Sequence, residues 1–483
     1  MPQSGLASSK VNTSKLFAPG ALNASRNHFD NASSPGWAAR GYRRLLAHQY
    51  KLLITSRSDL LEIGCGDGEL LTHLDAESVS GVDVSSVQIK RAAARLPKGD
   101  FQVQSGEELS LPRIFDTIII SDTINLAADV QRLFERAQTV SKPSTRLILN
   151  YHSNLWSPLF TLAEWFGLRE QGPPSNWLAS ADVVNLLRLA EWEPISIQHR
   201  ILFPFYLGGL GQVINRVLTP ILPLFCLSVF VVARPLRPVE QQARRLSVSV
   251  IIPARNEAGN IAAAVERIPT MGTGTELIFV EGHSRDDTWS QIQRTAAEHP
   301  HLSIKILRQT GKGKGDAVRA GFAAATGDIL MILDADLTMP PEELPKFYEV
   351  IASGKAEFAN GVRLVYPMDE KAMQFLNLCA NKTFGLIFTW LLGQPVKDTL
   401  CGTKALSRAH YEKIAANRAY FGDFDPFGDF DLLFGAAKLN LKIADIPIRY
   451  RQRTYGETNI QRWRHGWLLL RMVIFAARKL KFV

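Results

Sequence analysis

The chain has 483 residues, of which 46% are hydrophobic and 21% are charged. This balance is typical of globular domains and excludes a wholly disordered or fibrous protein. Only four cysteines occur and none forms a Cys-x-x-Cys pair, so neither a disulfide scaffold nor a structural zinc site is expected. The low cysteine content fits a reducing, cytoplasmic compartment.

The net charge of +9 is concentrated at the C-terminus. Residues 449–483 carry nine Arg or Lys residues against the single acid Glu457, and the rest of the chain is nearly neutral. Local basic charge of this kind favours an anionic membrane surface or a phosphate-bearing substrate as the partner. No nucleic-acid-binding motif accompanies it, so nucleic acid is the least favoured partner.

Two stretches of the chain alternate short apolar strands with helical segments, which predicts α/β domains with mainly parallel sheets. A run rich in proline and charge, from Ala233 to Arg245, separates them. We expect a flexible arm at 1–41, a first α/β domain at 42–235, a linker at 236–246, a second α/β domain at 247–460 and a basic helix at 461–483.

A glycine-rich turn follows the first predicted strand. Glycines alternate through residues 64–68, directly after the apolar run 59–63. Alternate glycines let the backbone turn sharply and approach a ligand without clashes from Cβ atoms. Asp83 ends the next predicted strand, 21 residues after Glu62, where a carboxylate can accept hydrogen bonds from ribose hydroxyls.

These residues resemble the cofactor motif of class I S-adenosylmethionine-dependent methyltransferases, over residues 42–235. The resemblance implies a Rossmann-like fold that binds S-adenosyl-L-methionine through its glycine turn and an acid on the ribose. The cofactor-binding residues that it implies are Glu62, Gly64, Cys65, Gly66, Gly68 and Asp83. Ser105 departs from the family, which usually has Asp there. The methyl acceptor is not readable, but Tyr151 and His152 follow a predicted strand and are candidates to face it.

The second domain carries polar motifs at its predicted strand ends. The strand 248–253 runs into Ala-Arg-Asn-Glu, and a turn rich in glycine and lysine at 310–316 opens a helix. The strand 329–333 leads into Asp334-Ala335-Asp336. Two carboxylates at a strand end form a hard oxygen site for Mg2+ or Mn2+, which can neutralise the charge on a departing diphosphate.

This set resembles the inverting family 2 glycosyltransferases of GT-A fold, and among them the polyprenyl-phosphate (dolichol-phosphate type) sugar synthases, over residues 247–460. The resemblance implies transfer from a nucleotide-diphosphate sugar to polyprenyl phosphate or another lipid acceptor, with Asp334 and Asp336 as metal ligands. The nucleotide-sugar-binding residues that it implies are Pro253, Arg255, Glu257, Glu281, Lys314, Asp334, Ala335, Asp336, Arg363, Arg453 and Asn459. Residues 398–404 resemble the acceptor-site loop. Asn459 stands where Lys is usual, and Glu281 where Asp is usual.

The acceptor decides whether glycosyl transfer needs a base. A phosphate is anionic near neutral pH and needs none, whereas a lipid or glycan hydroxyl needs one. For the hydroxyl alternative, Asp429 and Asp431 in the acid-rich stretch 422–431 are the candidate catalytic residues, beside Asp336 at the metal. A further alternative makes the first domain a scaffold that binds S-adenosyl-L-methionine without catalysis.

The C-terminal segment predicts an amphipathic helix lying in the membrane plane. Arg464, Arg471 and Arg478 are seven residues apart and share one helical face. An arginine costs about 2.5–3.5 kcal/mol at a bilayer centre, so a transmembrane span is not expected. The alternative is a helix packed on the second domain. The apolar stretch 383–392 would extend the same membrane face, giving a bifunctional cytoplasmic enzyme at the membrane periphery.

Overall fold

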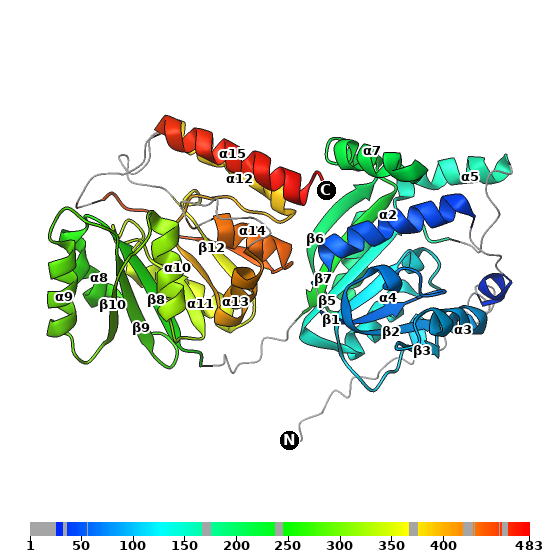
Figure 1. The fold of residues 1–483 in the computed structure, drawn as a ribbon, viewed down its shortest axis with the longest axis horizontal. Helices are drawn as coiled ribbons and strands as arrows, with labels where there is room; N and C mark the ends of the chain where they lie inside the picture. Colours follow the sequence, from blue (N-terminus) through cyan, green and yellow to red (C-terminus); the bar gives the residue numbers. More distant parts are fainter. Residues whose placement is uncertain are drawn as a thin grey trace, which may run out of the picture. The chain divides into compact units, whose positions relative to one another are not determined.

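The computed structural model describes residues 26–31, 36–55, 57–166, 175–236, 245–366, 375–418, 428, 430–453, 455 and 462–483. It divides into two compact units, Met1–Leu236 and Arg237–Val483. Each unit is built around a seven-stranded sheet with helices on both faces (Figure 1). In the part of the chain that the structure describes, no helix is both long and apolar enough to cross a membrane.

The sheet of the first unit has the strand order β3-β2-β1-β4-β5-β7-β6. Its strands are β1 (Ser58–Ile63), β2 (Ala76–Asp83), β3 (Asp100–Val103), β4 (Phe115–Ser121), β5 (Ser141–His152), β6 (Trp192–Ile201) and β7 (Ser228–Pro235). All neighbours are parallel except β7, which runs antiparallel to both β5 and β6. This topology confirms the expected Rossmann-like, methyltransferase-type domain.

Helices cover both faces of this sheet, so its central strands are buried and almost continuously apolar. The helices are α2 (Trp37–Leu53), α3 (Ser86–Arg95), α4 (Val130–Thr139), α5 (Ser157–Trp165), α6 (Ser180–Leu189) and α7 (Leu210–Leu218). Helix α2 begins inside the segment for which a flexible arm is expected. It forms there because Leu46, Tyr50 and Leu53 recur at helical spacing and bury one face of the helix in the core.

The sheet of the second unit has the strand order β10-β9-β8-β11-β13-β12-β14. Its strands are β8 (Val248–Ala254), β9 (Thr275–Glu281), β10 (Ser303–Arg308), β11 (Ile329–Ile332), β12 (Phe358–Val362), β13 (Lys404–Ser407) and β14 (Ile443–Pro447). Only β13 is antiparallel to its neighbours. The mixed sheet confirms the expected GT-A-like domain, and the parallel strands β8, β9 and β11 end at one edge.

Two hydrophobic clusters lie on the two faces of this sheet, because successive side chains of a strand point in opposite directions. Val250 and Ile252 of β8 belong to one cluster and Ile251 to the other. The surrounding helices are α8 (Ile261–Arg267), α9 (Thr288–Glu298), α10 (Lys314–Ala324), α11 (Leu344–Ala352), α12 (Phe375–Leu392), α13 (Arg408–Ala416), α14 (Phe430–Lys438) and α15 (Arg462–Leu480).

Helix α15 packs against α12 at the C-terminal end of the chain (Figure 1). One face of α15 is buried in the core of the second unit through Leu469, Met472 and Ala476. This face therefore agrees with the alternative expectation, a helix packed on the second domain. The opposite face is exposed, and it carries Trp467, Leu470, Arg471, Ile474 and Arg478.

Candidate cofactor and donor sites

The glycine turn after β1 adopts backbone angles that side chains rarely allow. Gly64, Gly66 and Gly68 all have positive φ, at 78°, 51° and 72°. A Cβ atom at Gly64 would collide with Thr123, and one at Gly68 would lie 3.2 Å from the Cβ of Ala92. At Gly66 a Cβ atom would meet nothing within 4 Å. Gly66 therefore faces open space, on the side from which a ligand can approach the backbone.

Asp83 lies directly against this turn. One carboxylate oxygen accepts a hydrogen bond from the amide of Gly66 at 2.9 Å, and the other accepts one from the amide of Ser85 at 2.9 Å. Burial raises the pKa of Asp83, and the two backbone donors offset only part of that rise. The structure thus brings together the turn and the acid that the sequence spacing pairs.

Glu62 and Cys65 line the base of the same turn and are both buried. Burial raises the pKa of the Glu62 carboxyl, and the positive charge of Arg43 opposes the rise. Among the described residues, the Oε2 atom of Glu62 has no hydrogen-bond partner. An unpaired buried carboxylate oxygen suits the cationic groups of S-adenosyl-L-methionine. Burial also raises the pKa of the Cys65 thiol, which disfavours a thiolate there.

Two further segments contact the turn or the neighbouring strand end, and neither contact was predicted. Arg43 of α2 donates to Asp67 at 3.2 Å and to Glu69 at 2.8 Å, which ties this helix to the turn. The short helix 26–30 contacts the next strand end, where Ser85 donates to Asp30 at 2.5 Å. Neither segment carries a motif, so only the tertiary fold reveals the contacts.

A polar cluster surrounds Asp122, which follows β4 and has a left-handed backbone with φ 53°. Its carboxylate accepts from the amide nitrogen of Asn150 at 2.5 Å and lies 3.4 Å from Nε2 of His152. Burial raises the pKa of Asp122, and His152 and Asn150 offset part of the rise. Tyr42 adds its hydroxyl, 3.3 Å from Nε2 of His152. We define Tyr42, Asp122, Asn150 and His152 as the Asp122 cluster.

The Asp122 cluster adjoins the glycine turn. Thr123 donates to the carbonyl of Ile63 at 3.2 Å and packs against Gly64. Of the two candidates to face a substrate, His152 belongs to the cluster. Tyr151 is instead buried, and its hydroxyl lies 2.8 Å from that of Ser180. Tyr151 therefore supports the core and does not face the turn.

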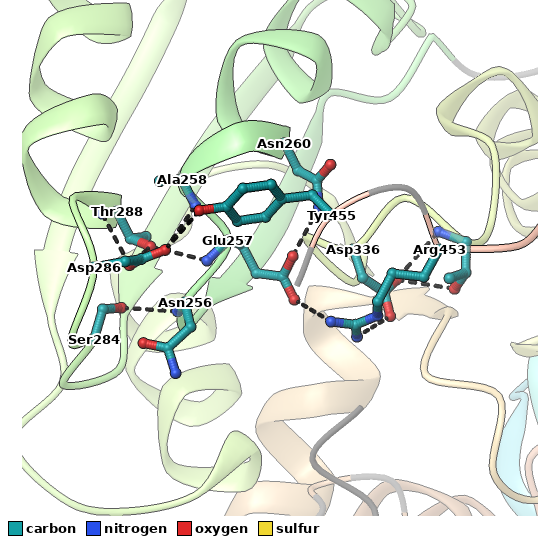
Figure 2. Close-up of polar contacts among 11 residues, drawn as sticks. Asn256, Glu257, Ala258, Asn260, Ser284, Asp286, Thr288, Asp336, Arg453 and Tyr455 are labelled. Atoms are coloured by element: carbon teal, nitrogen blue, oxygen red, sulfur yellow. Dashed lines mark hydrogen bonds and ion pairs between the residues drawn. The ribbon is translucent and has the colours of Figure 1, made fainter. Parts of the chain in front are cut away.

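In the second unit, ion pairs gather around the Asp-x-Asp motif after β11. Lys314, at the start of α10, lies 2.5 Å from Asp334. Arg453 donates to Asp336 at 2.7 Å and to Glu257 at 2.9 Å, as Figure 2 shows. Ala335 between the two aspartates is buried and fixes the turn. Three of the predicted donor-site segments therefore meet around these carboxylates.

The surroundings shift the pKa values of Asp334 and of the neighbouring Glu257 in opposite directions. Burial alone would raise the pKa of Asp334, but the ammonium of Lys314 outweighs it, so the pKa lies below the ordinary 3.8. At Glu257 burial prevails over the neighbouring Arg453, and the pKa is raised. Asp334 is therefore ionised at neutral pH, as an oxygen ligand for a cation must be.

The turn after β8 is held by its neighbours. Asn256 has a left-handed φ of 57°, and its amide donates to Ser284 at 3.1 Å. The amide of Ala258 donates to Asp286 at 3.3 Å, and the hydroxyl of Tyr455 donates to the same carboxylate at 3.4 Å (Figure 2). The ring of Tyr455 also lies over Gly259, where a Cβ atom would touch it. Asp286 and Tyr455 were not predicted, although both lie in runs that the sequence marks as turns.

Three predicted residues frame this turn in different ways. Pro253 is partly buried within β8, where it pairs with Val280 of β9. Arg255 is exposed. Glu281 ends β9 and accepts a hydrogen bond from the amide of Ser284 at 2.5 Å, so it caps the following turn. Of these three, Arg255 is therefore the one whose side chain stands at the surface.

Arg363, which is expected to contact a phosphate, pairs with a carboxylate in this structure. Its guanidinium makes a two-pronged pair with Asp398, at 2.7 and 2.8 Å. Burial would raise the pKa of Asp398, but Arg363 outweighs it and holds the pKa below 3.8. The pair anchors the loop 398–404 to the end of β12. Gly402 of that loop packs so closely on Asp334 and Lys314 that a Cβ atom would clash with both.

The two candidate bases for a hydroxyl acceptor are described unequally. Asp431 is buried at the start of α14, where Arg418 donates to it at 2.8 Å. Asp429 and Asn459 lie outside the described residues. In the described segments, no three His, Cys, Asp or Glu side chains are grouped to hold a metal ion by themselves. Asp334 and Asp336 supply the carboxylate oxygens that a hard divalent ion prefers.

Comparison with known families agrees with this geometry. Residues 37–197 match the family model described as "Methyltransferase domain". Residues 249–415 match the family model described as "Glycosyl transferase family 2". The chain thus joins a methyltransferase domain to a family 2 glycosyltransferase domain, as the motifs predict.

The second domain has curated relatives among lipid-linked sugar transferases. It is 31% identical over 224 residues to "Dolichol-phosphate mannosyltransferase" of Pyrococcus furiosus, covering 45% of this chain and 60% of that protein. It is 35% identical over 216 residues to "Undecaprenyl-phosphate 4-deoxy-4-formamido-L-arabinose transferase" of Klebsiella pneumoniae, covering 44% of this chain and 62% of that protein. The match therefore spans less than two thirds of either relative.

Solved structures resemble each unit at lower identity. The match to glucosyl-3-phosphoglycerate synthase from Mycobacterium tuberculosis covers 49% of this chain and 78% of that protein, with 20% identity and a TM-score of 0.36. The match to magnesium protoporphyrin IX methyltransferase from Synechocystis covers 44% of this chain and 99% of that protein, with 15% identity and a TM-score of 0.30.

Proposed function

We propose that the second unit transfers a sugar, with inversion, from a nucleotide-diphosphate sugar to polyprenyl phosphate. The observation that carries the proposal is the meeting of Asp334, Asp336, Lys314 and Arg453 at one strand end. Carboxylates beside cations suit a metal-bound diphosphate, since each charge of the ligand finds its opposite. The relatives are named for dolichol phosphate and undecaprenyl phosphate, which supports this acceptor class.

Asp334 and Asp336 would hold Mg2+ or Mn2+, which when bound neutralises charge on the leaving diphosphate. Lys314 and Arg453 are placed to bind the same phosphates once the aspartates engage a cation. The loop 398–404, held by Arg363, forms the neighbouring wall and is the expected acceptor side. A phosphate acceptor needs no general base, and the described candidate, Asp431, is already ion-paired with Arg418.

Product analysis tests this proposal. Purified protein is given labelled UDP- and GDP-sugars, Mg2+ or Mn2+, and either undecaprenyl phosphate or undecaprenol. We expect a lipid-linked product from the phosphate alone, and none from Asp336→Asn. Absence of product across the whole donor panel would contradict glycosyl transfer to this acceptor class. Product from the alcohol, lost in Asp429→Asn or Asp431→Asn with donor binding intact, would favour the hydroxyl alternative.

We further propose that the first unit binds S-adenosyl-L-methionine and transfers its methyl group. The open face of Gly66, the carboxylate of Asp83 and the unpaired oxygen of Glu62 support cofactor binding. His152, oriented by Asp122, is placed to accept a proton from the methyl acceptor. Calorimetry measures cofactor binding and a methyl-release assay on the glycosylated lipid measures turnover. Binding without turnover on any acceptor would support the scaffold alternative.

We also propose that the second unit rests on an anionic membrane through α12 and α15. Trp467, Leu470 and Ile474 are exposed on the same face as Arg471 and Arg478. Leu386 and Trp390 add exposed apolar side chains from the neighbouring helix α12. Each basic residue near an anionic surface contributes about 1 kcal/mol of binding. Sedimentation with vesicles containing phosphatidylglycerol should therefore weaken when Arg471 and Arg478 are replaced by Gln.

A further inference from the structure

The first unit has an exposed apolar surface of its own, far in sequence from the basic C-terminus. It is formed by α5 and by residues 207–225, which include α7. We call it the α5–α7 surface. The two segments are joined where the indole of Trp156 donates to the carbonyl of Phe225 at 2.9 Å. Its most exposed members include Leu159, Trp165, Leu210, Val213, Val217 and Leu224.

Helix α7 is turned with its polar side inward. Asn215 is buried, where its side chain bonds the amides of Leu202 and Phe203 at 2.9 and 2.7 Å. Leu210, Val213 and Val217 lie three and four residues apart, so they share one face, and that face is exposed. A surface helix in a water-soluble protein normally turns its apolar stripe to the core. The reversed orientation requires an apolar or amphipathic partner.

The extent of the surface points to the same conclusion. Residues 221–225 are all exposed, and four of the five are large and apolar. In α5, Leu159 and Leu162 are about half exposed and Trp165 is 76% exposed. Scattered apolar residues are ordinary on protein surfaces, whereas a contiguous patch marks an interaction site. Two helices and a loop contribute to this one.

The charge around the surface identifies the partner. Residues 200–225 contain Arg200 and Arg216 and no Asp or Glu, and α5 contributes one acid, Glu164. Burial lowers the pKa of His48 on α2, and the positive charges of Lys51, Arg200 and Arg216 lower it further. Arg216 is an exposed residue of α7, and the hydroxyl of Thr219, directly after this helix, donates to the carbonyl of Arg200 at 3.0 Å. An apolar face rimmed by positive charge is complementary to an anionic lipid surface.

The same charges argue against the other occupants. The exposed face of α15 is also apolar and basic, so docking the second unit on α7 would bring like charges together. A second copy of the chain would do the same. A bilayer that contains anionic lipid is complementary to each face taken separately. We propose that the α5–α7 surface of the methyltransferase domain docks on an anionic lipid bilayer, independently of α12 and α15.

This placement brings the bilayer close to the Asp122 cluster. The ring of Phe160, on α5, lies 5.6 Å from that of His152 in an edge-on arrangement. A methyl acceptor carried on a lipid would reach the cluster along α5. This last step rests on the methyl transfer proposed above, whereas lipid binding by the surface does not, and the two are tested separately.

Hydrogen exchange of the full-length protein, with and without vesicles, tests the docking. The vesicles contain phosphatidylcholine with or without phosphatidylglycerol. We expect amides of 207–225 to gain protection with the anionic vesicles only. Protection confined to 462–480 would overturn the proposal, because the C-terminal helix would then account for all membrane contact. The readout is independent of either enzymatic activity.

Variants make the test specific. Val213→Glu with Val217→Glu places two charges on the outer face of α7 and should weaken vesicle binding about tenfold. Ile114→Glu is the matched control, because Ile114 is 52% exposed in the loop before β4, outside the surface. Its binding should equal that of the unchanged protein. Circular dichroism checks that the variants are folded. Light scattering without vesicles measures the radius and mass of the protein, which would change if the surface instead bound the second unit or a second copy of the chain. Unchanged vesicle binding with an altered radius or mass would overturn lipid docking in favour of protein contact.

Discussion

Arg453 donates to Asp336 at 2.7 Å across 117 residues of sequence, and its other terminal nitrogen donates to Glu257. One guanidinium therefore connects the chain at Arg453, the Asp-x-Asp motif and the turn after β8. Because both partners are carboxylates, Arg453 holds the three segments together by opposite charge. Figure 2 shows that Tyr455, two residues later, closes over the same turn.

Replacing Arg453 by Met should reduce glycosyl transfer about 100-fold, since a charge stabilising the leaving diphosphate is lost. The buried carboxylate of Glu257 would also lose its ion pair with the guanidinium, which costs about 1–3 kcal/mol of stability. Steady-state rates and thermal unfolding measure the two effects. Arg451→Met is the matched control, because Arg451 is exposed and hydrogen-bonds Thr338 only through its backbone amide among the interactions described. Equal rates for both variants would contradict the role of Arg453.

The glycine turn offers a paired test of cofactor binding. Gly66→Ala puts a methyl group into open space, so it should weaken S-adenosyl-L-methionine binding at least tenfold, at a strain cost of about 1–2 kcal/mol. Gly68→Ala carries the same strain, but its methyl group presses on Ala92, inside the fold. It should therefore lose more stability and less affinity. Calorimetry and thermal unfolding separate the two. Equal loss of affinity would show that Gly66 does not face the cofactor.

The Arg363–Asp398 pair predicts a pH dependence of stability. The folded pKa of Asp398 is depressed, so its contribution is present above the ordinary pKa of 3.8 and is lost as the pH falls through the folded value. Asp398→Asn should cost about 3–5 kcal/mol at pH 7, because it leaves Arg363 buried without its counter-charge. Native-state hydrogen exchange of β12 and β13 amides reports this unit alone. A variant that loses stability below pH 4 as steeply as the unchanged protein would contradict the assignment.

His152→Gln should lower methyl transfer about 100-fold and leave cofactor affinity unchanged, since the imidazole is placed to take a proton and not to hold the cofactor. The methyl-release assay on the glycosylated lipid and calorimetry give the two numbers. Tyr151→Phe is the matched control: it removes a neighbouring hydroxyl that contacts Ser180. Turnover unchanged in His152→Gln would remove the proposed base.

Much of the fold was predictable because its signals are local. Short apolar strands and glycine turns place β1, β8 and β11, and parallel strands end at the same sheet edge. That rule already brings Asp83 to the glycine turn and groups the strand-end acids of the second unit. The Asp122 cluster was visible only in part, through His152.

Other features could not be predicted because pairing across the chain decides them. The sequence does not show that the side chain of Arg363 pairs with Asp398, because the two residues are 35 positions apart and only the fold brings them together. Tyr455 and Asp286 meet across 169 residues. The orientation of helix α7 could not be predicted from the sequence for a related reason. Its apolar stripe normally predicts a buried face, and only the burial of Asn215 shows which side points outward.

The position of β7 has a consequence for how the protein is made. Among the described strands, β7 is the sole partner of β6 and lies between it and β5. Until β7 has left the ribosomal exit tunnel, β6 has no strand of this sheet to pair with. The sheet of the first unit is complete only when Pro235 has left the exit tunnel. Synthesis of the second half then gives this domain time to finish before its neighbour appears.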